Sequence, residues 1–424
     1  TKYRPWPQKW NALLIPGNND LRPTVNTAKI QLAGALDRLD DVYAAMLALA
    51  VSLPAFLGSG YSFKPIFYAL VLLPALGLMA VRHIKPEYIL RQCPAIALLV
   101  VPLLYWSLTN AWSDHPENVS AFLRRSLTLF VFLLAIAHLT LRLGPQLQRY
   151  LDVALLLAGA GAAVHLLGLP FMEPKGPNWR LGDATIFSRS LHASHYFGFF
   201  AIYGLVRFYQ HSAFTERLRF ILPACFCLGF VVFTESRGTL ISFLLVALLV
   251  SGVWYRRYAQ SALIVLLTVV GGYLIQDVLL ERGLSFRLEI WRATWEIVQA
   301  NFWGGIGLGT PLGVEYGGKF VAPHAHNLLY DLQARAGILG LLLFLPIVAF
   351  VLSRMWRAER DEQVYVAALL FFLLCVMTDV HKPINSPSSI YVIFWLPLAA
   401  LLALRSGGVG QRASAEPVAD GGAS

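Results

Sequence analysis

The sequence predicts an all-α protein that crosses a membrane about twelve times. Apolar residues make up 57% of the 424 residues and charged residues only 14%, against roughly 45–50% and 25% in an average soluble domain. The mean hydropathy is +0.59 over the whole chain, so apolar segments recur along it rather than forming a single anchor. This composition excludes an ordinary soluble enzyme.

Apolar runs of nearly membrane-spanning length follow one another along the chain. A bilayer core about 30 Å thick needs roughly 20 apolar helical residues. The first 40 residues (1–40) contain prolines and scattered charges without a cleavable signal pattern, and they predict a cytoplasmic segment. A transmembrane domain is expected over 41–405, and the Gly/Ala/Ser-rich residues 406–424 predict a disordered cytoplasmic tail. The runs lie at 41–58, 65–81, 93–111, 126–141, 150–169, 192–209, 218–234, 238–255, 261–280, 337–353, 363–380 and 388–404.

The basic residues indicate how the chain is oriented. The 34 Lys and Arg residues outnumber the 24 Asp and Glu residues, but they lie mainly in short segments between apolar runs. We therefore attribute them to membrane orientation and expect no nucleic-acid partner. The larger share lies on the side of the two termini, which predicts that this side is cytoplasmic. The opposite side holds two longer segments, 170–191 and 281–336, with room for chemistry.

The segment 281–336 predicts a helix lying in the membrane interface. Trp291, Trp295, Val298 and Phe302 recur at helical spacing, which is typical of an amphipathic helix. The tryptophans serve equally well as interfacial anchors or as substrate contacts.

Two arginines on the polar face of this helix are candidate phosphate contacts. A guanidinium can donate to two phosphate oxygens at once and keeps its charge at any relevant pH. Arg287 and Arg292 therefore predict an anion-binding surface. The alternative is pairing with Glu289 or Glu296 on the same helix.

Two histidines follow a glycine run at 304–309. The run lacks the Lys and Ser/Thr of a phosphate-binding P-loop, so it does not predict nucleotide binding. His324 and His326 can take a proton near neutral pH. A helix starting here would point them about 200° apart, and we favour His326 as the reactive one. Alternatively, His326 is a structural residue at the N-terminus of a helix and forms a hydrogen bond with Asn327 or Tyr330.

The short Thr-Glu-Ser-Arg-Gly sequence at 234–238 places Arg237 at the outer boundary of the membrane. An arginine costs roughly 2.5–3.5 kcal/mol at the bilayer centre and less near the interface, so a compensating partner is expected. The partner is either Glu235 or a phosphate group at the N-terminus of the next helix. Arg180 and Arg189 add positive charge on the same side.

The SRG turn, the FRLEIW segment, the GIGLG run and the HAHN motif, in this order, resemble the O-antigen ligase family of Gram-negative bacteria. The motifs cover roughly 230–350, and the helix layout covers the whole chain. The resemblance implies a fold of the glycosyltransferase C type, with a periplasmic helical loop over a membrane-facing cleft. It implies transfer of O-antigen polysaccharide from undecaprenyl diphosphate to a sugar hydroxyl of lipid A-core at the periplasmic face of the inner membrane.

The resemblance assigns roles motif by motif. Arg237 and Arg287 correspond to diphosphate contacts, and His326 corresponds to the catalytic histidine. Further substrate-binding residues are expected at Arg180, Arg189, Arg292, His324, Asn327 and Tyr330. The outward segments contain no Asp-x-Asp motif, so we expect no metal and no cofactor, with the arginines stabilising the leaving diphosphate. Attack from the face opposite the diphosphate would invert the anomeric configuration.

Other functions remain open at this point. An O-antigen polymerase or a protein O-oligosaccharyltransferase would share the donor and change the acceptor. A transporter of lipid-linked sugars would explain the outward basic groups without catalysis, but neither an internal repeat nor an ion-coupling charge within an apolar run supports it. His138 and His165 are more simply packed core histidines. A purely structural scaffold would leave the convergence of a histidine and two arginines unexplained.

Overall fold

A computed structural model describes residues 38–172, 180–187, 190–274, 286–316, 320–379 and 382–413. The chain divides into two compact units, Thr1–Val42 and Tyr43–Ser424. Most of the predicted cytoplasmic segment 1–40 lies outside the described residues. The described residues of the first unit are the start of the helical segment Arg38–Phe56. The description that follows concerns the second unit.

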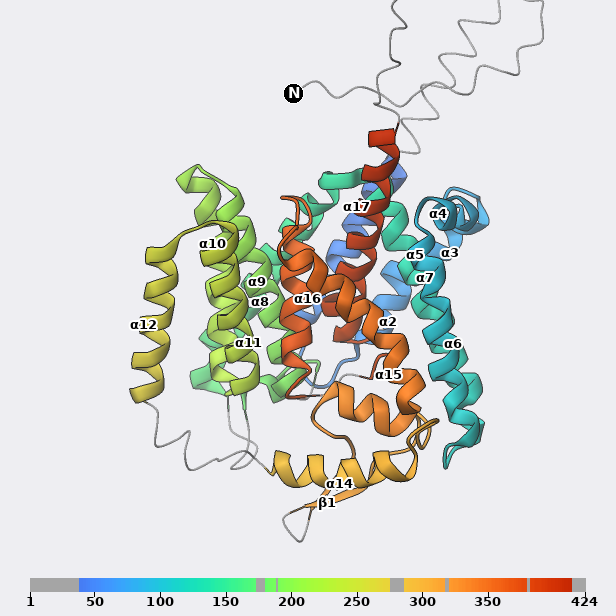
Figure 1. Ribbon diagram of the computed structural model, residues 1–424. Coiled ribbons are helices and arrows are strands. Elements are labelled where there is room, and N and C mark those ends of the chain that lie inside the picture. Colours follow the sequence, from blue (N-terminus) through green and yellow to red (C-terminus); the bar gives the residue numbers. More distant parts are fainter. Residues whose placement is uncertain are drawn as a thin grey trace, which may run out of the picture. The chain divides into compact units, whose positions relative to one another are not determined.

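The second unit is mostly helical (Figure 1). Its α-helices are α2 (Phe63–Phe67), α3 (Leu73–Ala80), α4 (Pro86–Gln92), α5 (Pro94–Leu98), α6 (Val100–Leu108), α7 (Val119–Leu143), α8 (Leu147–Gly168), α9 (Ser190–Gln210), α10 (Phe214–Phe233), α11 (Arg237–Leu248), α12 (Tyr258–Leu274), α14 (Arg287–Ala300), α15 (Leu328–Met355), α16 (Gln363–Cys375) and α17 (Leu396–Ala413). Shorter 3-10 or π segments are η2 (Leu53–Phe56), η3 (Tyr68–Leu72), η4 (Thr109–Trp112), η5 (Pro116–Asn118), η6 (Gly144–Gln146), η7 (Leu169–Phe171), η8 (Leu181–Ala184), η9 (Leu249–Trp254) and η10 (Tyr391–Trp395). One antiparallel hairpin pairs β1 (Val314–Tyr316) with β2 (Phe320–Ala322).

The helical and polytopic character predicted from the apolar runs is confirmed. Each predicted run overlaps helical residues. By length and composition, six segments among the described residues are long and apolar enough to cross a membrane. They are Arg38–Phe56, Phe63–Ala80, Pro94–Trp112, Pro116–Phe171, Arg237–Trp254 and Leu328–Met355.

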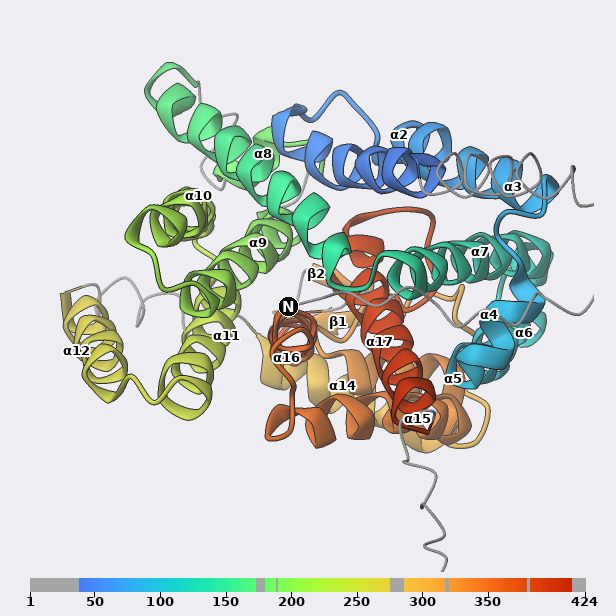
Figure 2. The same cartoon turned by 90° about the horizontal axis from the view of Figure 1, so that it is seen from above.

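Helix α9 lies among several partners. It packs against α8, α10, α11 and α16, and Figure 2 shows α9, α10 and α11 side by side. Helix α14 has a different orientation and lies across the ends of the long helices in Figure 1. It packs against α15 and β1, which places the predicted interfacial helix directly beside the segment that follows the paired histidines.

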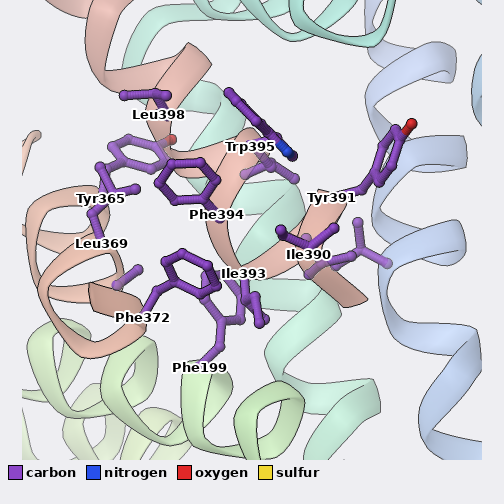
Figure 3. Close-up of a cluster of buried hydrophobic side chains, with 14 of the residues drawn as sticks. Phe199, Tyr365, Leu369, Phe372, Ile390, Tyr391, Ile393, Phe394, Trp395 and Leu398 are labelled. Atoms are coloured by element: carbon purple, nitrogen blue, oxygen red, sulfur yellow. The ribbon is translucent and has the colours of Figure 1, made fainter. Parts of the chain in front are cut away.

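The aromatic core fixes the connection between α16 and the last helix (Figure 3). The rings of Phe372 and Phe394 stack with centroids 4.6 Å apart. The indole N–H of Trp395 donates to the carbonyl of Pro383 over 3.1 Å. Both contacts anchor the ends of a connection that carries charged residues.

Three boundaries differ from the predicted ones. Helix α15 begins at Leu328, within the segment expected to be a loop, and it is interrupted at Gly337, where φ is 66°. Helix α16 ends at Cys375 rather than near 380. Helix α17 continues to Ala413, past the start of the predicted tail, and residues 414–424 lie outside the described part.

The two histidines predicted to lie in the core are buried, and three of the four cysteines are buried as well. His138 and His165 are buried, and their rings contact those of His83 and Phe230. The cysteines are all free.

Candidate functional site

Helix α14 directs its two arginines to different environments. Arg287 is half-buried and Arg292 is exposed. Five residues of helix separate them by about 140° of rotation, so they do not share one face. Arg292 makes no ion pair within the described part of the chain. On the inner side, the Trp291 indole N–H donates to the carbonyl of Ala325 over 2.9 Å, which attaches the helix to the HAHN turn.

The HAHN turn precedes helix α15 instead of starting it. Asn327 is the N-cap, and its side-chain oxygen accepts from the N–H groups of Leu329 and Tyr330 at 3.0 and 3.2 Å. The prediction that the histidines point about 200° apart is therefore wrong, because it assumed a helix through both of them. The rings of His324 and His326 are in contact, with centroids 4.2 Å apart.

His326 faces an acidic residue from the end of another helix. Its Nδ1 lies 3.7 Å from Oδ1 of Asp379, and that carboxylate is buried. The backbone of His326 is left-handed, with φ at 51°, a region that histidine, asparagine and aspartate enter more readily than most residues. The turn thereby presents the imidazole to Asp379.

The HAHN turn also positions the segment that carries Asp379. The Asn327 side-chain amide donates to the carbonyl of Met377 over 3.1 Å. The N–H of Leu328 donates to the carbonyl of Val376 over 2.8 Å. Asn327 therefore caps one helix and holds the end of another, which makes it a positioning residue for the His326–Asp379 pair.

The SRG turn approaches the same segment from the opposite side. Arg237 is the first residue of α11, whose N-cap is Ser236. A Cβ added at Gly238 would overlap the Thr378 hydroxyl, so the glycine allows this close approach. The Ser236 and Thr239 hydroxyls are 2.8 Å apart and close the turn.

Electrostatic interactions connect these elements. Burial lowers the pKa of the Arg287 guanidinium, Asp379 acts in the opposite direction, and Arg237 lowers that pKa further. Buried His195 on α9 also interacts with Asp379. Arg287 thus interacts with both Arg237 and Asp379, and Asp379 lies 3.7 Å from His326, so residues of three separated motifs lie around one carboxylate.

Arg180 lies at the edge of this cluster. Its Nε is 3.7 Å from Oε2 of Glu235 in the SRG sequence. The turn that carries Arg180 is held by Asp183, which accepts from the Arg180 N–H at 3.1 Å and from the Ser190 hydroxyl at 3.0 Å. Glu235 is therefore engaged with Arg180. Arg189, the other basic residue predicted here, lies outside the described residues.

The first turns of α15 carry a second, structural group of contacts. Tyr330 stacks on Trp291 with ring centroids 6.0 Å apart. Asp331 accepts from the Ala325 N–H at 3.1 Å and pairs with Nε of Arg335 at 2.9 Å. Arg335 is buried and also donates to backbone carbonyls of the glycine-rich segment. The glycine run therefore packs on α15.

Asp379 is the residue that sequence reasoning missed. It lies near the end of the predicted apolar run 363–380 and was not among the predicted site residues. An acidic residue that directly follows an apolar run, with Lys382 close behind, is the signal that could have identified it.

Among the described residues of this site, no three His, Cys, Asp or Glu ligand atoms come together as a metal would require.

Comparisons with known proteins agree with the motif resemblance. Residues 222–345 match the family described as O-antigen ligase. This range contains Arg237, Arg287 and His326, whereas Asp379 lies beyond it. The chain is also similar to the O-antigen ligase of Pseudomonas aeruginosa, with 25% identity over 353 residues that cover 82% of this chain and 86% of the relative. The two findings agree with the resemblance and support an enzyme of the O-antigen ligase type.

Proposed function

We propose that this enzyme transfers O-antigen polysaccharide from undecaprenyl diphosphate to a sugar hydroxyl of lipid A-core during lipopolysaccharide synthesis. The observation that carries the proposal is the convergence of two arginines and a His–Asp pair from four separate segments. Arg237, Arg287, His326 and Asp379 supply the two functions that the reaction requires, namely anion binding and proton removal.

The arginines bind and stabilise the leaving diphosphate. Departure of the donor places additional negative charge on the phosphate oxygens, and fixed cations next to them lower the barrier. Arg287 is half-buried and interacts electrostatically with Arg237, so an anion bound between the two would relieve the repulsion of their charges. A diphosphate is thus the ligand that these two groups favour. Arg180 acts at the outer edge of the site, Arg189 adds positive charge for donor binding, and Arg292 contacts the more distant part of the donor.

His326 acts on the acceptor. The acceptor hydroxyl oxygen attacks the anomeric carbon, the bond from that carbon to the phosphate oxygen breaks, and the bonding pair leaves with the diphosphate. The proton of the hydroxyl passes to the imidazole of His326. Asp379, 3.7 Å from Nδ1, orients the ring and stabilises the imidazolium, as a carboxylate does beside other catalytic histidines. The anomeric configuration inverts.

The neighbouring residues support this geometry. Asn327 holds the turn, and Tyr330 and His324 line the acceptor side. In this proposal the transfer uses neither a metal nor another cofactor, because the arginines neutralise the diphosphate. The site faces the periplasm, both termini are cytoplasmic, and about twelve helices of a glycosyltransferase C-type fold hold it in the inner membrane.

The test is transfer by the purified full chain in detergent, with undecaprenyl-diphosphate-linked glycan as donor, lipid A-core as acceptor and EDTA present throughout. Product should form with the wild type and be lost in His326→Ala. His115→Ala is the matched control, because His115 is exposed and lies on the same predicted side of the membrane. Equal activity of the two variants would contradict the assignment of His326.

The choice of acceptor separates this function from those of related enzymes. A parallel reaction offers a second lipid-linked glycan or a protein in place of lipid A-core. Product on either of these, with none on lipid A-core, would show an O-antigen polymerase or a protein O-oligosaccharyltransferase. Donor binding that depends on Arg237 without any transfer would instead favour a transporter. NMR of the product linkage tests inversion.

A further inference from the structure

A cavity of about 430 Å³ lies at the opposite ends of the helices that build the catalytic site. It is formed by the end of α9, the start of α10, the residues after η9 and the connection between α15 and α16. Its volume falls within the roughly 300–1,000 Å³ typical of small-molecule sites.

The cavity is separate from the proposed catalytic site. His195 lies near the start of α9, whereas Gln210 at the end of that helix lines the cavity. Helix α9 has 21 residues, which at about 1.5 Å per residue spans roughly the thickness of a bilayer core. Similarly, Arg237 starts α11, while the cavity lies just after η9 at the far end of the same continuous helical segment.

The cavity lining is strongly basic. Arg217, Arg257 and Arg360 contribute to it, and no carboxylate is among the described residues that line it. Two of the guanidinium groups are held in place: Nε of Arg217 donates to the carbonyl of His211 over 2.8 Å, and Arg360 donates to the carbonyl of Gln210.

The acidic residues of this region are engaged elsewhere or stand beside the cavity. Asp152 forms a two-pronged pair with Arg207, at 2.8 and 2.7 Å. Glu216 on α10 interacts with His211, and Asp361 follows Arg360 without lining the cavity. The positive charge of the three lining arginines therefore has no carboxylate opposite it within the cavity.

His211 adds a buried nitrogen to the lining of the cavity. Its Nε2 is buried and has no hydrogen-bond partner among the described residues. Burial lowers the pKa of His211, and neighbouring Arg207 and Arg360 lower it further, against the opposing effect of Glu216 and Asp152. A neutral imidazole can donate one N–H to a ligand oxygen, and an anion beside it would relieve the excess of positive charge.

Two tyrosines line the cavity, and this residue type is common at the level of lipid headgroups. The rings of Tyr209 and Tyr255 stack with centroids 5.0 Å apart, and their hydroxyls donate to Gln260 and Gln363 at 2.7 and 2.6 Å. Tyrosine is enriched where apolar and aqueous regions meet at a membrane surface.

We propose that this cavity binds a phosphate group, either as the headgroup of an anionic phospholipid or as a free phosphate ion. Guanidinium groups match phosphate oxygens in geometry and charge. The site serves a ligand other than the sugar donor, because the proposed diphosphate contacts lie at the other ends of the helices.

The test compares the full chain in nanodiscs of two kinds. In one arm, phosphatidylcholine nanodiscs contain increasing fractions of phosphatidylglycerol. In the other arm, pure phosphatidylcholine nanodiscs are titrated with inorganic phosphate at constant ionic strength. The readout is the thermal unfolding midpoint from intrinsic tryptophan fluorescence, which rises as a ligand binds the folded state.

The test variant is Arg257→Gln/Arg360→Gln, which removes two exposed arginines of the cavity. The matched control is Arg149→Gln/Arg219→Gln, which removes two exposed arginines at the same helix ends but outside the cavity lining. Should the double variant fail to fold, Arg257→Gln alone serves, because its side chain is exposed.

The wild type and the control should show the same saturable stabilisation. In the test variant, the half-saturating ligand level should rise by about tenfold, since charged hydrogen bonds of this kind contribute more than about 1.4 kcal/mol. Stabilisation by phosphatidylglycerol alone identifies a lipid headgroup, and stabilisation by inorganic phosphate identifies the free ion. No stabilisation in either arm, or an equal loss in test and control variants, would overturn the proposal.

Discussion

Replacement of Asp379 by asparagine is the sharpest test of the proposed chemistry. The variant Asp379→Asn keeps the size of the side chain and removes its charge. The carboxylate lies 3.7 Å from Nδ1 of His326 and interacts with Arg287. In the proposed reaction, only the transition state places a positive charge on the imidazole, so the loss should affect the chemical step rather than donor binding.

The magnitude follows from the separation of the charges. Two unit charges 3.7 Å apart interact by about 4.5 kcal/mol at an effective dielectric constant of about 20. The His326 side chain is 27% exposed, and Arg287 competes for the same carboxylate, so we take about half of that energy. A loss of about 2 kcal/mol corresponds to a fall in kcat of about 30-fold.

The assay is steady-state transfer with varied donor concentration. In Asp379→Asn, kcat should fall while KM for the donor stays the same or decreases, because Arg287 loses a competing anion. Asp361→Asn is the control, since Asp361 is exposed and its backbone carbonyl, which the substitution keeps, accepts the hydrogen bond from Gln148. Thermal unfolding midpoints show whether the variant is folded. An unchanged kcat, or a raised KM at constant kcat, would refute the role of Asp379.

Three other perturbations have defined outcomes. Gly238→Ala introduces a Cβ that overlaps the Thr378 hydroxyl, so transfer should fall and be partly restored by adding Thr378→Ala; additive effects in this double-mutant cycle would argue against the contact. Asn327→Ala removes a helix cap worth about 1 kcal/mol and the hydrogen bond to the Met377 carbonyl, so it should lower the thermal unfolding midpoint. Asn327→Asp keeps the cap and should lower the midpoint less. Equal midpoints for the two variants would count against the capping role. Burial lowers the pKa of Lys382 to about 8 from 10.5, so the unfolded state binds more protons between these values and the folding stability should rise across that pH window. Lys382→Met should abolish this rise in the unfolding midpoint measured from pH 7 to 10. The same pH profile in the variant and the wild type would contradict the role of Lys382.

Three of the four residues of the proposed site could be named from the sequence. The apolar runs predict the helices because a helix that crosses the lipid core needs about 20 apolar residues. Arg237, Arg287 and His326 stand out since each lies in a polar segment on one predicted side of the membrane. The periodicity of Trp291 and Val298 predicts α14, and the structure adds that this helix packs on α15.

The relations between segments could not be predicted in the same way. Asp379 reaches His326 because Asn327 and Gly238 hold the end of α16 from two directions, and no local pattern encodes that contact. The prediction that His324 and His326 point in opposite directions was wrong because it started the helix too early, whereas Asn327 caps the helix after both histidines. Arg287 and Arg292 share a polar pattern in sequence, but only the rotation of α14 against its partners decides which one turns inward.

The left-handed backbone at His326 affects how any substitution there is interpreted. A β-branched residue at φ 51° would add backbone strain of about 1–2 kcal/mol to the loss of the imidazole. Asparagine tolerates this conformation well. Comparing His326→Asn with His326→Val would therefore divide the total effect into a chemical part and a conformational part. The same torsion angle also narrows the set of residues that could ever occupy the position, independently of catalysis.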